Sequence, residues 1–173
     1  MSFFAEILTA AARKVELAGA DFLPVACNAL HKVAAELQAQ IAIPLVHIAD
    51  VAAVEASRAH ALSVGLLGSR FVMEQDFYRE RFALRGIRVA IPGLAGRIDL
   101  DRIIYEELSR GEFLEASKHR VLETIDELVR SGSQAIVLGC TELPLLVNPQ
   151  DTDARLLDTM AIHVQAAVSG ALE

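Results

Sequence analysis

Short apolar runs alternate along the chain with longer segments in which apolar residues recur every three or four positions. The longer segments have the period of an α-helix, and the short runs have the length of strands that are buried on both faces. The predicted helices cover residues 3–18, 27–37, 50–61, 71–84, 99–109, 112–130 and 159–172. The predicted strands cover residues 22–26, 41–48, 62–67, 87–91, 134–138 and a short piece near 156–157.

This order of elements predicts the fold class. Strands that alternate with helices at this spacing are typical of the α/β class, in which helices cover both faces of a parallel sheet. A chain of 173 residues suits one domain, or two small lobes that share a core. Two aspartates, Asp50 and Asp158, stand where helix caps are expected. The apolar face predicted for the first helix consists of Phe4, Ile7, Leu8, Ala11 and Val15.

Composition narrows the possible partners and locations. Apolar residues make up 53% of the chain, but no run of about 18 uncharged apolar residues occurs, so a membrane span is not expected. The first residues, with Glu6 inside an apolar stretch and no basic residue ahead of it, suit an amphipathic helix better than a secretory signal. The net charge of −7 argues against nucleic acid or an anionic membrane as partner. We therefore expect a cytoplasmic protein.

Cys27 and Cys140 are the two cysteines of the chain and lie far apart in sequence. A disulfide is conceivable, but nothing suggests secretion, and cytosolic thiols stay reduced. Neither cysteine belongs to a CxxC pair and the five histidines lack metal-ligand spacing, so we expect no metal site. One interpretation makes each cysteine a small buried apolar residue. The other interpretation follows from where the two cysteines stand.

Three predicted strands end in small or polar residues: Cys27-Asn28, Gly68-Ser69 and Gly139-Cys140-Thr141. Ligands of α/β proteins bind at the carboxyl ends of the strands. At a strand-to-helix junction, the unpaired N–H groups of the helix favour the thiolate and lower the thiol pKa from about 8.5 toward neutrality. Two such thiols on opposite sides of one carbon remove a proton from one face and return it to the other, which inverts that centre.

The neighbours of the cysteines suit the same chemistry. Hydrogen bonds from Thr141 and Asn28 to a substrate carboxylate would stabilise the enolate-like intermediate. Glu142 would orient a thiol or bind an ammonium group. The alternative is that Thr141 and Glu142 are an ordinary helix cap and a first-turn acidic residue.

Five segments resemble the aspartate/glutamate racemase family, in the family's order. LGCTELPLL (138–146) resembles its C-terminal signature, and ACNALHKVAAELQ (26–38) is similar to its first cysteine motif. GLLGSRFVMEQDFYRERF (65–82), IIYEELSRGEF (103–113) and LLDTMAIHVQAAV (156–168) look like the matching stretches between and after them.

The resemblance implies a two-lobed, pseudo-symmetric fold and racemisation of a small amino-acid or dicarboxylate substrate without pyridoxal phosphate, metal or nucleotide. It implies one catalytic cysteine from each lobe, Cys27 and Cys140, and a homodimer. The first lobe would comprise residues 1–61 with 157–173, and the second residues 62–156. The substrate-binding residues implied are Asn28, Ala29, Ser69, Thr141, Glu142 and Arg110. Arg110 stands where some relatives place a basic residue that meets a side-chain carboxylate; the alternative is an exposed arginine at a helix end.

Three departures from the family pattern stand out. The family opens with a strand and a glycine-rich loop, so the first lobe here is expected to lack a strand–helix–strand portion. Asn28-Ala29 replaces the common Asn-Thr, and Ser69 stands where threonine is frequent. These departures keep two alternatives open: a non-catalytic remnant that binds small carboxylates, and an isomerase or decarboxylase of the same superfamily.

Three histidines carry competing interpretations. His31 follows Cys27 by four residues and would either tune that thiol or pack locally within its helix. His47 and His163 would either reach the cleft or serve as hydrogen-bonded structural residues.

Overall fold

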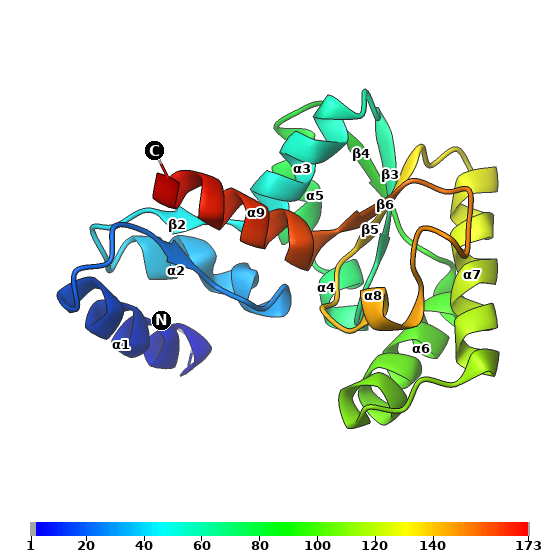
Figure 1. The fold of residues 1–173 in the computed structure, drawn as a ribbon, viewed down its shortest axis with the longest axis horizontal. Helices are drawn as coiled ribbons and strands as arrows, with labels where there is room; N and C mark the ends of the chain where they lie inside the picture. The colour runs from blue at the N-terminus through cyan, green and yellow to red at the C-terminus, as the bar shows by residue number, and fades with distance from the viewer. Residues whose placement is uncertain (1–2, 173) are drawn as a thin grey trace.

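A computed structural model describes residues 3–172 of the protein (Figure 1). Its strands are β1 (Leu23–Pro24), β2 (Leu45–Val46), β3 (Ser63–Leu67), β4 (Arg88–Ala90), β5 (Ala135–Leu138) and β6 (Leu156–Asp158). Its α-helices are α1 (Phe3–Leu17), α2 (Ala34–Gln38), α3 (Ile48–Arg58), α4 (Arg70–Glu74), α5 (Phe77–Ala83), α6 (Leu94–Arg102), α7 (Glu115–Arg130), α8 (Leu143–Leu146) and α9 (Thr159–Leu172). Shorter helical segments are η1 (3₁₀, Ala29–Val33), η2 (π, Ile103–Glu107) and η3 (3₁₀, Leu108–Arg110).

The main sheet has four parallel strands in the order β4-β3-β5-β6. Its central strands, β3 and β5, are buried along their whole length, as continuous apolar runs predict. A second, two-stranded parallel sheet pairs β1 with β2. The predicted α/β class, with parallel sheets flanked by helices, is confirmed.

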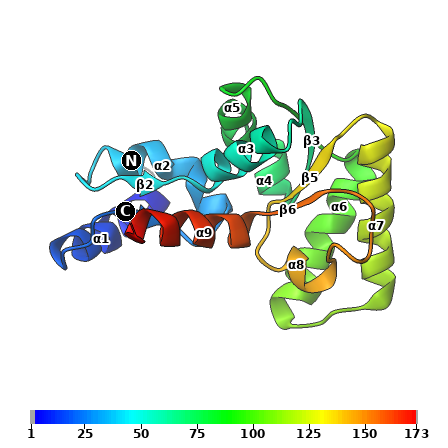
Figure 2. The ribbon, with the colours of Figure 1, turned by 45° about the horizontal axis from the view of Figure 1, so that its top comes forward.

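Helices cover both faces of the main sheet (Figures 1 and 2). Helix α7 packs against β3 and β5 on one side, and α3 and α5 lie on the other side. Helix α9 runs from the end of β6 along α3 toward the small sheet, where α1 and α2 pack together. The side chains of Tyr78, Phe82, Met73 and Ile125 are among those fully buried in the core around the main sheet.

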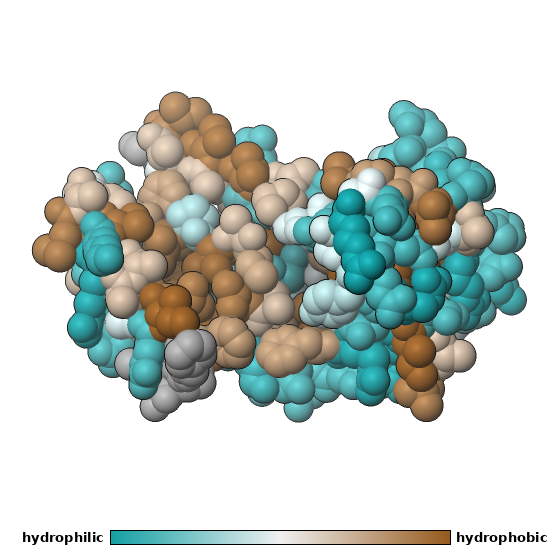
Figure 3. Space-filling model, turned by 90° about the horizontal axis from the view of Figure 1, so that it is seen from below, coloured by the Kyte–Doolittle hydropathy of each residue, from teal (hydrophilic) through white to brown (hydrophobic). Residues whose placement is uncertain are grey.

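Helix α1 faces the protein with its small residues. Ala5 and Ala12 are buried, whereas Phe4 is 61% exposed and Ile7 is 53% exposed. The predicted apolar face is therefore buried only in part: Leu8 packs against the cluster that includes Ala12, while the larger Phe4 and Ile7 side chains stay exposed. Figure 3 shows the molecule from below relative to Figure 1, with apolar surface in the half that contains α1.

Several predicted boundaries change. The strands 22–26 and 41–48 shrink to two residues each, and the helix expected from Cys27 begins as the 3₁₀ turn η1. The predicted helix 71–84 is interrupted between α4 and α5. The helix predicted over 99–109 begins earlier, as α6, and passes into π and 3₁₀ turns that end at Gly111 in a left-handed conformation.

One of the two predicted caps is confirmed. The Asp158 carboxylate accepts hydrogen bonds from the backbone N–H groups of Met160 and Ala161 at 2.9 and 3.1 Å. Asp50 caps nothing, because α3 begins two residues earlier, and His47 Nδ1 accepts from the N–H of Ala49. Between residues 3 and 172, no helix has the length and apolar character needed to cross a membrane.

Candidate active site

The loops that carry the two cysteines line one open pocket of about 300 Å³. Both thiols are free and partly buried. The pocket brings together all but one of the site residues predicted from the sequence. It is lined by Ala26, Cys27, Asn28, Ala29, Ser69, Val72, Ile104, Tyr105, Ser109, Gly139, Cys140, Thr141 and Glu142.

Parallel pairing explains why the second half of the site assembles. Strands β3 and β5 run side by side, with Leu67 opposite Leu138, so Ser69 and Cys140 emerge at the same edge of the sheet. Two glycines let the strand ends approach closely. A Cβ on Gly139 would lie 2.8 Å from the carbonyl oxygen of Leu67, and one on Gly68 would lie 3.0 Å from the carbonyl oxygen of Gly139. Larger residues at these two positions would force the loops apart.

Cys140 forms a compact hydrogen-bonded group with its neighbours. Its Sγ–H donates to Oε2 of Glu142 at 2.9 Å, and the Thr141 hydroxyl donates to the same oxygen at 2.7 Å. Burial and then the Glu142 carboxylate raise the pKa of Cys140 to about 12. Burial alone would raise the pKa of Glu142, but the hydrogen bonds from Cys140 and Thr141 outweigh it and lower that pKa. At neutral pH the pair is thus a thiol beside a carboxylate.

This state of Cys140 corrects the sequence prediction of a thiol pKa lowered toward neutrality. The helix that follows, α8, has four residues, Leu143–Leu146, and its field is correspondingly weak. Backbone N–H groups of Glu142 and Leu143 do favour the thiolate. Their effect is smaller than that of burial together with the adjacent negative charge.

Asn28 lines the pocket, yet its side-chain amide is engaged within the protein. Its Oδ1 accepts a short hydrogen bond from the hydroxyl of Tyr78, and its Nδ2 donates to Thr159 Oγ1 at 3.1 Å. The Thr159 hydroxyl in turn donates to the carbonyl oxygen of Leu138 at 2.7 Å. All three side chains are buried. The chain of hydrogen bonds connects the loop after Cys27 with the strand end two residues before Cys140.

Three buried histidines, His31, His47 and His163, gather beneath the Cys27 loop. The His31 ring lies 4.6 Å from the His47 ring and 5.7 Å from the His163 ring, measured between centroids. His31 Nδ1 lies 2.8 Å from the carbonyl oxygen of Cys27, and His163 Nε2 lies 2.8 Å from that of Val46. None of the three is a lining residue of the cysteine pocket, as far as the described residues show. Their contacts support the structural interpretation.

Burial controls the charge of two of these rings. It lowers the pKa of His31 to about 4, helped by the charge of His163, although the hydrogen bond to Cys27 works in the opposite direction. Burial followed by the charge of His31 lowers the pKa of His47 to about 3. Both rings are therefore neutral at physiological pH. Within residues 3–172, no group of three or more His, Cys, Asp or Glu residues is arranged to hold a metal.

The remaining predicted residues divide between the pocket and the surface. Ser69 is buried, and its Oγ accepts from the N–H of Val72 at 3.4 Å, which leaves its hydroxyl proton for a ligand. Ala29 lines the pocket through its place beside Asn28. Arg110 is exposed and is absent from the described lining residues.

Sequence reasoning missed the wall of the pocket formed by Ile104, Tyr105 and Ser109. These residues belong to the π-helical and 3₁₀ turns that follow α6. Departures from the α-helix of this kind occur often at functional sites. The apolar period of the segment gives no sign of them, because it fits an ordinary helix equally well.

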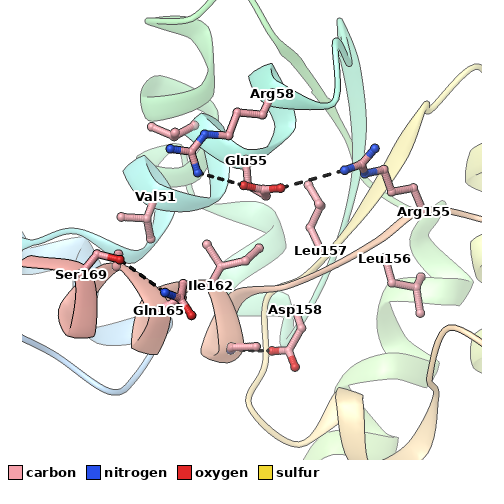
Figure 4. A pocket seen from close by; sticks show the side chains of 13 residues that line it. Val51, Glu55, Arg58, Arg155, Leu156, Leu157, Asp158, Ile162, Gln165 and Ser169 are labelled. Atoms are coloured by element: carbon pink, nitrogen blue, oxygen red, sulfur yellow. Dashed lines mark hydrogen bonds and ion pairs between the residues drawn. The ribbon is translucent and has the colours of Figure 1, made fainter.

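A larger cavity, of about 630 Å³, lies between α3, α9 and β6 (Figure 4). Val51, Leu157 and Ile162 contribute apolar side chains to it, and Glu55 pairs with Arg58 on its rim at 3.3 Å. It shares no described lining residue with the cysteine pocket. Since it contains neither cysteine, we place the candidate active site in the smaller pocket.

Comparisons with known proteins identify the family to which the chain is similar. The family model Asp/Glu/Hydantoin racemase matches residues 3–167. The solved structure of a candidate Asp/Glu racemase from Yersinia pestis is similar with a TM-score of 0.92 and 43% identity, over 98% of this chain and 74% of that one. An aspartate racemase homologue from Pyrococcus horikoshii OT3 gives a TM-score of 0.89 and 33% identity over the same shares.

Among curated proteins, the glutamate racemase of Latilactobacillus sakei is 26% identical over 132 residues. That match covers 75% of this chain and 47% of the relative. The chain thus spans about half the length of this curated racemase.

Proposed function

Since the chain belongs to the Asp/Glu/hydantoin racemase family, we propose that it is an amino-acid racemase that moves the α-proton of its substrate between Cys27 and Cys140. The observation that carries this proposal is that both free thiols line one pocket. We propose further that residues 1–61 with 157–173 and residues 62–156 act as two lobes, each supplying one of these thiols.

The proposed reaction consists of two proton transfers. A thiolate on one side removes the α-proton, and the electron pair of the broken C–H bond delocalises into the carboxylate as an enolate. The thiol on the opposite side then donates its proton to the other face of the α-carbon. The centre is inverted, and the two sulfurs have exchanged their protonation states. No external oxidant, reductant or cofactor enters the balance.

Glu142 favours the protonated form of Cys140 at the start of the reaction. The carboxylate that accepts the Sγ–H hydrogen bond favours the thiol form, so Cys140 begins as the proton donor. In the reverse direction Cys140 acts as the base in the thiolate form that remains after it has given its proton to the α-carbon. Glu142 therefore acts on Cys140, which transfers the proton to carbon.

The weakly acidic α-proton requires stabilisation of the enolate by hydrogen-bond donors. Ser69 offers a hydroxyl proton inside the pocket. Asn28 holds the loop that follows Cys27 in place, because its amide is hydrogen-bonded to Tyr78 and Thr159. Each donor of this kind contributes about 3 kcal/mol to such a transition state.

The test compares the purified chain with Cys27→Ser and Cys140→Ser. Racemisation is followed by chiral chromatography, and α-proton exchange is followed in D₂O by mass spectrometry. We expect either substitution to abolish inversion, while exchange without inversion persists at the thiol that remains. Circular dichroism checks that both variants fold. Inversion at an undiminished rate in both variants would contradict the proposal. Conversion of the substrate to a product other than its enantiomer would indicate an isomerase or decarboxylase instead.

A further inference from the structure

The residues that line the cysteine pocket indicate which class of substrate it accepts. This inference rests on the proposed function. Among the described residues that line the pocket there is no lysine, arginine or histidine. The lining carries one carboxylate, that of Glu142, whose pKa is lowered by hydrogen bonds from Cys140 and Thr141 despite its burial. The pocket is therefore neutral to negative at physiological pH.

Three of the cations close to the pocket in sequence, Arg70, Arg102 and Lys32, are engaged by other groups. Arg70, next to Ser69, forms an ion pair with Glu74 at 3.0 Å. Arg102, ahead of the wall segment, pairs with the carboxylate of Glu107. Lys32 donates to Gln75 at 2.7 Å and lies 5.1 Å above the ring of Phe71.

The part of the pocket wall formed by Ile104, Tyr105 and Ser109 is apolar and hydroxylic. Ile104 is buried, at 4% exposure, and presents only hydrocarbon. The Ser109 hydroxyl donates to the backbone carbonyl of Tyr105 at 2.7 Å, so its proton is already used. Tyr105 is 57% exposed and offers a phenol at the pocket. No group on this wall compensates the charge of a carboxylate.

We infer that the substrate is an α-amino acid with an uncharged side chain, in preference to aspartate or glutamate. An acidic substrate brings two carboxylates into a pocket of about 300 Å³. Hydrogen bonds from Ser69 and loop N–H groups can serve one of them. The second would lie unpaired near ionised Glu142, and burying an unpaired charge is strongly unfavourable. A short aliphatic or hydroxylated side chain instead fits Ile104 and Tyr105.

The first experiment measures kcat/KM of the full chain for alanine, serine, valine, aspartate and glutamate. We expect at least one neutral amino acid to exceed both acidic ones by about tenfold or more. The Ser109→Arg variant places a guanidinium on the pocket wall. It should raise the ratio of kcat/KM for acidic amino acids to kcat/KM for neutral ones by a similar factor. The control is Arg130→Ala, which changes the number of arginines by one at the exposed end of α7, outside the described pocket lining. A wild-type preference for aspartate or glutamate overturns the inference, as does loss of aspartate turnover in Arg110→Ala, which would assign side-chain recognition to Arg110.

Binding separates this inference from the proposed function. Calorimetric titration of the Cys140→Ser variant with serine and with aspartate reports recognition without turnover. Tighter binding of serine supports the inference even if the wild-type chain racemises nothing, an outcome that would refute only the proposed function. Tighter binding of aspartate, or binding of neither amino acid, overturns the inference.

Discussion

The thiol of Cys140 donates a hydrogen bond to the carboxylate of Glu142 at 2.9 Å, and this contact opposes ionisation of the sulfur. Removing the negative charge should lower the pKa of Cys140, although burial, the larger cause, keeps it above that of a free thiol. In the Cys27→Ser background, we expect Glu142→Gln to increase the rate of iodoacetamide alkylation at pH 8, about tenfold for each unit of pKa.

Glu142→Asp is the matched control because it keeps the charge and shortens the side chain. Alkylation profiles that coincide for Glu142→Gln and the parent would show that Glu142 does not govern Cys140. In the chain with both cysteines, Glu142→Gln should also reduce kcat, since the carboxylate that keeps the proton on the Cys140 sulfur before donation is lost.

The bridge from Tyr78 through Asn28 and Thr159 to Leu138 should set the spacing of the two thiols. Thr159→Val removes one hydroxyl without changing the volume much and leaves Asn28 Nδ2 and the Leu138 carbonyl without this partner. We expect a loss of about 1–3 kcal/mol in the free energy of unfolding. In D₂O, the ratio of exchange with retention to inversion should rise, because a displaced second thiol protonates the enolate less often.

Thr159→Ser keeps the hydroxyl and should restore the ratio of exchange to inversion. A ratio in Thr159→Val equal to that of the parent, with lowered stability alone, would reduce the bridge to a structural role.

The buried histidines should make stability depend on pH. The folded protein lowers the pKa of His31 from 6.5 to about 4, so its contribution is complete above pH 6.5 and is lost as the pH falls toward 4. The difference corresponds to roughly 3 kcal/mol at most for this one group. Urea unfolding at pH 7 and pH 5 should show lower stability at pH 5. His31→Gln should flatten that dependence, and an unchanged dependence in this variant would assign the acid sensitivity to other groups.

The close approach of β3 and β5 requires glycine at position 139. Gly139→Ala places a methyl group 2.8 Å from the Leu67 carbonyl oxygen, and we expect a loss of about 1–3 kcal/mol in stability together with reduced turnover at the adjacent Cys140. Gly93→Ala is the matched control, since its φ is −56° and its Cβ would meet nothing within 4 Å. Equal melting temperatures for the two variants would contradict this account of the loop.

Much of the framework could be predicted from local pattern alone. Apolar runs such as Ala135–Leu138 identify buried strands because a strand covered on both faces needs continuous hydrocarbon. Cys140 could be placed at a strand end for the same reason, and parallel pairing brought it to the pocket edge. Asp158 was recognisable as a cap because its partners lie within three residues.

Other features depend on contacts between distant parts of the chain. The partner of the Asn28 amide, Thr159, lies 131 residues away, and no local pattern records that pairing. The exposure of Phe4 followed from which face of α1 packs, a choice that periodicity leaves open. Arg110 is exposed outside the described pocket lining, in a segment whose π and 3₁₀ turns are not indicated by its apolar period.

The sequence by itself therefore determined the α/β class, the position of Cys140 after a buried strand and the family, because these depend on period and on neighbouring residues. The tertiary structure decided the burial of Cys140, the partners of Asn28 and the uncharged pocket wall. These properties depend on how much water and which charges surround a group, and packing between distant elements sets both.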